Sequence, residues 1–132
     1  MFTAQQIKDA HAKVKTGADY PRYVQDLKKL GVSYYEYSVE HSKNMYYNKE
    51  GVFVTVEHVG AALRTVSENP SSEKLEYFLK IHQQGQSDFP TFCAQAAEVG
   101  VEKWTSDLEK MVCSYFDKKG NTLYAELIPG VS

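Results

Sequence analysis

Residues 19–57 read DYPRYVQDLKKLGVSYYEYSVEHSKNMYYNKEGVFVTVE, and residues 88–126 read DFPTFCAQAAEVGVEKWTSDLEKMVCSYFDKKGNTLYAE. A shift of 69 positions aligns the two stretches without a gap, and nine of the 39 aligned pairs are identical. Several identities fall on residues that restrict the backbone, namely Asp19/Asp88, Pro21/Pro90, Gly31/Gly100 and Gly51/Gly120. Upstream, a shift of 68 aligns Ile7 with Leu75. The pattern predicts an internal duplication.

Each repeat is predicted to begin with two helices. Residues 3–6 form a capping box for a first helix that runs to about Thr16. Asp19 is expected to cap the next helix, whose apolar stripe has helical spacing and which ends at Gly31. The second repeat copies this order, with one helix from residue 69 to Gly85 and another from Asp88 to Gly100.

Strands follow the helices in both repeats. Tyr35, Tyr37 and Val39 alternate with polar residues, which is typical of a half-buried strand. Residues 48–51 and 117–120 are typical of type I turns, and each ends on a glycine that we expect at positive φ. The sequence leaves open whether each repeat has two or three strands, and it favours three in the first repeat. A short edge strand is expected at residues 64–66.

These elements predict an α+β fold with helices packed on an antiparallel sheet. The chain, residues 1–132, is expected to form one compact domain. Its two repeats, at about 1–59 and 70–128, are joined by residues 60–69 and related by a pseudo-twofold axis.

Composition excludes several classes of protein. The 132 residues include 17 acidic and 15 basic side chains, so a general surface for binding nucleic acid is not expected. No apolar run is long enough for a membrane span, and we see no signal peptide, which favours a cytoplasmic location. Cys93 and Cys113 are therefore expected as reduced thiols. No metal or cofactor motif is present.

Short strings in both repeats resemble the YdfO-like family of bacterial proteins. They are residues 17–21 (GADYP), 82–85 (HQQG), 88–93 (DFPTFC), 100–104 (GVEKW) and 113–117 (CSYFD). The family is often found in prophage regions and is sometimes labelled a phage envelope protein. The resemblance covers nearly the whole chain and implies an α+β fold, a bacterial cytoplasmic setting and no established activity. The envelope label has no support in the sequence.

Four residues are weak candidates for catalysis. Cys93 lies near a helix N-terminus with His82 upstream, but its place on an apolar stripe favours a buried thiol. Glu57 and Glu126 recur on the last strands, on the face opposite Val54 and Leu123. They would form a carboxylate pair if the twofold axis passes between those strands. Two solvated glutamates are the alternative.

Tyrosines supply the candidate binding residues. The chain has 10 tyrosines, and the candidates for ligand contact are Tyr34, Tyr35, Tyr37, Tyr46 and Tyr124. Their rings form either a core or an exposed aromatic patch that marks a binding surface. We favour a non-enzymatic protein that binds a protein or small molecule through the aromatic sheet face or the groove between repeats. A small cysteine- or carboxylate-dependent hydrolase or transferase is the alternative. A homodimer is possible, and no cofactor is expected.

Overall fold

The computed structural model describes residues 1–15, 17–57 and 63–128, so residues 58–62 of the predicted first repeat and linker lie outside the described residues. Within the described ranges, each half of the chain carries two α-helices followed by three strands. The first half holds α1 (Ala4–His11), η1 (Gly17–Asp19), α2 (Tyr20–Leu30), β1 (Tyr34–Ser38), β2 (Lys43–Tyr47) and β3 (Phe53–Glu57). The second half holds α3 (Ser72–Gln83), α4 (Phe89–Glu98), β4 (Lys103–Asp107), β5 (Val112–Phe116) and β6 (Thr122–Leu127).

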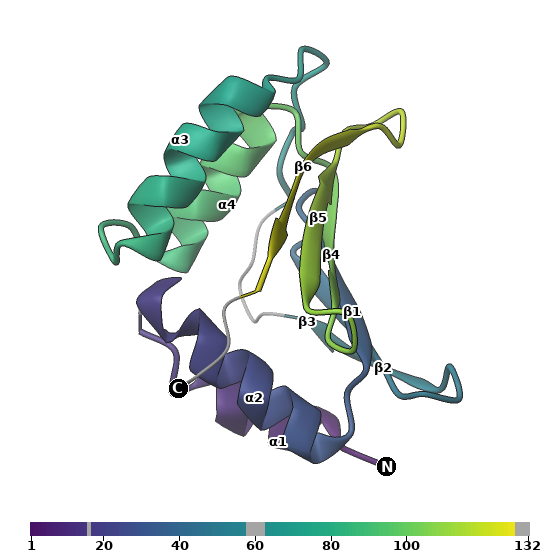
Figure 1. The fold of residues 1–132 in the computed structure, drawn as a ribbon. Coiled ribbons are helices and arrows are strands. Elements are labelled where there is room, and N and C mark those ends of the chain that lie inside the picture. Colours follow the sequence, from purple (N-terminus) through teal and green to yellow (C-terminus); the bar gives the residue numbers. More distant parts are fainter. Residues whose placement is uncertain (16, 58–62, 129–132) are drawn as a thin grey trace.

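The strands form one antiparallel sheet in the order β3-β2-β1-β4-β5-β6. Both helix pairs lie on the same side of this sheet, with α1 and α2 over one end and α3 and α4 over the other (Figure 1). The opposite face of the sheet carries no helix in the described part of the chain (Figure 1). The α+β class predicted from the sequence is confirmed, with three strands in each half.

The two halves of the sheet are joined by the antiparallel pairing of β1 with β4, and this pairing is called the seam below. Glu36 pairs with Thr105, and Tyr35 and Tyr37 pair with Ser106 and Trp104. Thr105 stands 69 positions after Glu36, so the register of the seam is centred on one pair of aligned positions. The two helical layers therefore meet over the middle of the sheet.

The helix boundaries differ from the sequence prediction in the first half. The capping box of Thr3 and Gln6 is confirmed, but α1 already ends at His11 instead of near Thr16, which lies outside the described residues. Asp19 makes no side-chain cap on α2; its carboxylate instead accepts a hydrogen bond from Lys15 N at 2.9 Å. A 3₁₀ turn before α2 places the Asp19 backbone in the helical region, so the expected cap was wrong.

The second half follows the prediction more closely. Asp88 caps α4 by accepting a hydrogen bond from Thr91 N at 2.9 Å. Ser71, rather than residue 69, caps α3 through Lys74 N. The strand expected at residues 64–66 is absent, and that segment is held instead by a hydrogen bond from Arg64 N to the carbonyl of Glu40.

The outer hairpins are built alike. Gly51 and Gly120 have φ values of 82° and 83°, which confirms the left-handed residue predicted at the end of each turn. Their turns are closed by Asn48 and Asp117, whose side chains each accept two backbone hydrogen bonds.

The hairpins differ in the next strand, because β6 carries a register shift opposite Tyr115 and Phe116. Tyr46 pairs with Val54 in the first half, whereas Tyr115 pairs with Tyr124 in the second. One extra residue in β6 thus reverses which side chains beyond it face the helices.

Candidate functional site

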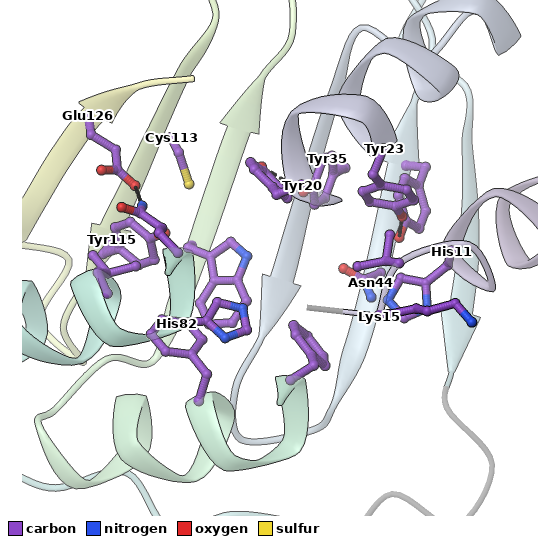
Figure 2. Close-up of a pocket in the computed structure, with 17 residues that line it drawn as sticks. His11, Lys15, Tyr20, Tyr23, Tyr35, Asn44, His82, Cys113, Tyr115 and Glu126 are labelled. Carbon is purple, nitrogen blue, oxygen red and sulfur yellow. Dashed lines mark hydrogen bonds between the residues drawn. The ribbon is translucent and has the colours of Figure 1, made fainter. Parts of the chain in front are cut away.

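A cavity of about 120 Å³ lies between the two helix pairs and the sheet. Figure 2 shows Glu126, Cys113, Tyr115 and His82 at one end. Tyr23, Asn44, His11 and Lys15 lie at the other end, with Tyr20 and Tyr35 between them (Figure 2). A cavity this size has room for a small organic group or several waters.

Sixteen of the 17 lining residues fall into eight pairs at the 68- or 69-residue shift. The pairs are His11/Leu79, Val14/His82, Lys15/Gln83, Tyr20/Phe89, Tyr23/Phe92, Tyr35/Trp104, Asn44/Cys113 and Tyr46/Tyr115. The seventeenth residue is Glu126, whose counterpart does not line the cavity. Both halves therefore supply the same positions to the wall, but they fill them with different chemistry.

Hydroxyl groups line the middle of the cavity and the end contributed by the first half. Tyr20 Oη lies 2.9 Å from Tyr35 Oη and 3.0 Å from Ser106 Oγ. Tyr23 Oη lies 2.7 Å from Tyr46 Oη. Burial raises the pKa of Tyr20, Tyr23 and Tyr35 well above the ordinary value, and that of Tyr46 to about 12. These tyrosines are neutral phenols that present both rings and hydrogen-bonding groups.

The end contributed by the second half holds the cavity's carboxylate. Gln83 Nε2 donates a hydrogen bond to Glu126 Oε1 at 2.7 Å, which links α3 to β6. Burial raises the pKa of Glu126, and the bond from Gln83 partly offsets that rise. Burial also raises the pKa of Cys113 to about 11, so this thiol is protonated at neutral pH. Ser106 Oγ donates to its sulfur at 3.7 Å.

His82 lies in the wall with its ring stacked on Phe92, at a centroid distance of 4.7 Å. Its Nδ1 lies 3.2 Å from both the carbonyl oxygen and the hydroxyl of Ser87. It thus fastens the loop after α3 rather than binding a free carbonyl of its own helix. Burial lowers the pKa of His82, so the ring is neutral at pH 7.

The candidate dyad of Cys93 with His82 is not assembled in the part of the chain that the structure describes. Cys93 is fully buried, as expected, and its sulfur donates to Tyr37 Oη at 3.5 Å. Burial raises the pKa of Cys93 to about 11, and the thiol does not line the cavity. His82 is engaged with Ser87 instead.

The predicted carboxylate pair of Glu57 and Glu126 is contradicted by the sheet order. β3 and β6 are the two outer strands, so the twofold axis does not pass between them. Glu57 pairs across the ladder with Lys43 on the uncovered face, whereas Glu126 pairs with Cys113 on the helix-facing side. The irregularity in β6 is the physical reason that the two glutamates face opposite ways.

The candidate tyrosines occupy four different environments. Tyr35 and Tyr46 line the cavity. Tyr37 is core, stacked on Trp104 at 4.7 Å. Tyr34 lies on the uncovered sheet face against Tyr47, with a centroid distance of 5.5 Å. Tyr35, Tyr37 and Tyr46 are therefore buried, whereas Tyr34 is half-buried on the uncovered face, and a binding role for any of them stays a prediction.

Tyr124 lies outside the cavity, in an adjoining open groove of about 410 Å³ between α3 and β6. The cavity and this groove share the side chains of Leu79, Gln83 and Glu126. The groove also carries Glu73, Glu76 and Lys80. The Gln83–Glu126 hydrogen bond accordingly stands where the groove meets the cavity.

Several lining residues were missed by sequence reasoning, among them His11, Asn44 and Gln83. Their signal was the repeat itself, because each has a lining counterpart at the same shift. Among the described residues, no group of three or more His, Cys, Asp or Glu side chains is placed to hold a metal ion. No helix in the described ranges is long and apolar enough to cross a membrane.

No curated protein matches the chain. One family model does, and it spans residues 8–127, which include every element from the body of α1 to the end of β6. The chain therefore belongs to the family described as "Protein of unknown function (DUF1398)".

Proposed function

We propose that this protein is a non-enzymatic binding protein that holds a small organic molecule in the cavity between its two halves. The observation that carries the proposal is the wall itself, which combines eight aromatic side chains of Tyr, Phe and Trp with a few polar groups. Ligand sites in proteins have this composition, with apolar rings for contact area and sparse polar groups for orientation.

The enzymatic alternative has less support. Both thiols have a pKa raised to about 11 by burial, whereas a nucleophilic cysteine needs a lowered pKa. The two glutamates considered as an acid–base pair lie on the two edge strands of the sheet and on opposite faces of it. We therefore propose binding rather than catalysis.

Trp104 makes the proposal testable without a label, because it is the single tryptophan and lines the cavity. Single-ring aromatic compounds that are neutral, cationic or anionic should be titrated while Trp104 fluorescence and the melting temperature are followed. A compound that enters the cavity should change the emission and raise the melting temperature. If no compound in millimolar amounts changes either quantity, the proposed function is wrong.

Cys113 locates the bound compound. In a Cys93→Ala variant, Cys113 is the one remaining thiol, and it is buried in the cavity wall. A compound held in the cavity should slow the modification of this thiol by iodoacetamide in the folded protein, measured at alkaline pH because the thiol is protonated at neutral pH. Unchanged modification in the presence of a compound that raises the melting temperature would place the binding elsewhere.

Other expectations from the sequence stay predictions. They are the duplication, the single domain of two repeats, the prophage origin, the cytoplasmic location and the homodimer. The matching element order and the paired cavity wall support the duplication.

A further inference from the structure

We propose that the cavity selects an organic cation, and that Glu126 is the residue that recognises its positive charge. This inference rests on the proposed function and adds the chemical class of the ligand. The ligand expected is a small ammonium compound with one apolar or aromatic group.

The first support is the way in which Glu126 reaches the cavity. The 69-residue shift aligns Glu126 with Glu57 in the sequence. Without the irregularity in β6, Glu126 would take the position of Glu57 in the sheet and face the uncovered side. With the extra residue, Glu126 takes the place that buried Val56 has in β3. Bulges occur near functional sites because they re-aim a side chain. Here the bulge replaces an apolar group with a carboxylate at the cavity wall.

The second support is the surroundings of this carboxylate. Its ladder neighbours on the helix-facing side are Cys113 and, one pair further, Tyr115 with Tyr124. Trp104 lies beside Tyr115 at a centroid distance of 5.7 Å. Aromatic faces attract cations, and a partly buried carboxylate such as Glu126 adds a charge-assisted hydrogen bond to that attraction. An ammonium group placed here would meet both kinds of partner.

The third support is the balance of charge along the approach. The groove that adjoins the cavity has Glu73, Glu76 and Glu126 against a single Lys80. A cleft lined by one sign of charge concentrates ligands of the opposite sign. The groove therefore favours the entry of cations over anions.

The basic groups of the cavity do not cancel this preference. His82 is neutral, because burial lowers its pKa. Lys15 lies at the far end of the cavity from Glu126, with His11 and Asn44 (Figure 2), and it is exposed to solvent. The charge facing a ligand at the Glu126 end is accordingly negative.

A charge-matched set of probes tests the inference. Benzylamine, benzyl alcohol and benzoate have similar size and carry a positive, no and a negative charge at neutral pH. Their dissociation constants should be measured from Trp104 fluorescence. We expect benzylamine to bind about tenfold or more tightly than benzyl alcohol, and benzoate to bind least.

Two variants assign the preference to its residue. Glu126→Gln keeps the size of the side chain, and we expect it to weaken benzylamine about tenfold while leaving benzyl alcohol within twofold. Glu57→Gln is the matched control, since it removes the aligned carboxylate from the uncovered face, and it should change neither. Thermal melts verify that both variants are folded.

The outcomes separate the two proposals. If benzyl alcohol binds as tightly as benzylamine, or if Glu126→Gln keeps the preference, the charge recognition is wrong while the binding function stands. If no probe changes the fluorescence of Trp104, the binding function is wrong and the charge recognition fails with it.

Discussion

The two ends of the cavity are built on the same backbone plan and differ in chemistry. At the end contributed by the first half, Tyr23 and Tyr46 share a hydroxyl–hydroxyl contact of 2.7 Å. At the aligned positions of the second half stand Phe92 and Tyr115, and the Tyr115 hydroxyl lies beside the Cys113 thiol instead. The second end alone carries a carboxylate.

This difference shows that the two halves agree more closely in their backbone than in the side chains that line the cavity. The bounds of the first two strands, the hairpin turns and the central ladder match between the halves, whereas the helix ends do not. The wall differs at residue after residue, and the largest change results from one bulge in β6. Two halves of similar backbone therefore enclose an asymmetric cavity, and the proposed ligand would bind in it in one orientation.

The largest expected effect is the difference in stability lost when Gly100 and its aligned residue Gly31 are each changed to alanine. Both have positive φ, but a Cβ at Gly100 would lie 2.6 Å from Pro70 Cα, whereas one at Gly31 meets nothing within 4 Å. Gly100→Ala should therefore cost about 2–5 kcal/mol of unfolding free energy. Gly31→Ala should cost about 1–2 kcal/mol. Urea unfolding of both variants measures the difference, and equal losses would show that Pro70 yields.

For the hairpin glycines we expect the opposite result, namely the same loss of unfolding free energy in both halves. A Cβ at Gly51 or Gly120 meets nothing within 4 Å, so strain at positive φ is the whole cost. Each change to alanine should lower the unfolding free energy by about 1–2 kcal/mol. The double variant should show the sum, because the turns belong to opposite ends of the sheet. A large departure from additivity in thermal melts would contradict this independence.

A smaller effect is expected when the first half is made to resemble the second. Tyr23→Phe gives position 23 the same side chain as the aligned residue, Phe92. It leaves Tyr46 Oη without its 2.7 Å contact, at a cost of about 1 kcal/mol. Chemical denaturation measures the loss. A variant as stable as the parent would mean that water replaces the lost hydroxyl, as a crystal structure of the variant would reveal.

The smallest effect concerns pH. The folded pKa of His82 is lowered by burial, so below its ordinary value of about 6.5 the unfolded chain binds more protons than the folded protein. The contribution of His82 to stability is therefore present above that pH and is lost as the pH falls. His82→Gln removes the titration. Between pH 8 and pH 5 the parent should lose more stability than the variant in parallel melts; identical pH profiles would contradict it.

The frame was predictable because its signals are local. Glycines at turns, capping residues and alternating aromatic side chains each restrict a few neighbouring residues, and the alignment of the two halves showed several of these signals twice. The predicted cap at Asp19 was wrong because the residues before α2 form a 3₁₀ turn, and the Asp19 carboxylate accepts a hydrogen bond from Lys15 N instead of from the first turn of α2.

The candidate site was less predictable because it depends on which face a side chain takes. Leu123, Ala125 and Leu127 alternate as a buried face should, yet Leu127 is 77% exposed and Glu126 faces the cavity. One added residue reverses the faces of a strand without altering its composition. The cavity also required knowledge of the strand order, which sets β1 beside β4 and the last strands apart.

The central ladder also bears on how such a chain could arise. Because β1 and β4 pair antiparallel about the aligned positions Glu36 and Thr105, an ancestral half-length chain could pair with its own copy through the same ladder. That ancestor would bring two Glu36 carboxylates face to face, and like charges directly opposite destabilise a sheet. In the present chain Thr105 stands opposite Glu36, and Lys103 Nζ lies 3.9 Å from its carboxylate. If the two halves arose by fusion of such copies, each half could lose the ability to pair with an identical copy while the β1–β4 ladder still joined it to the other half.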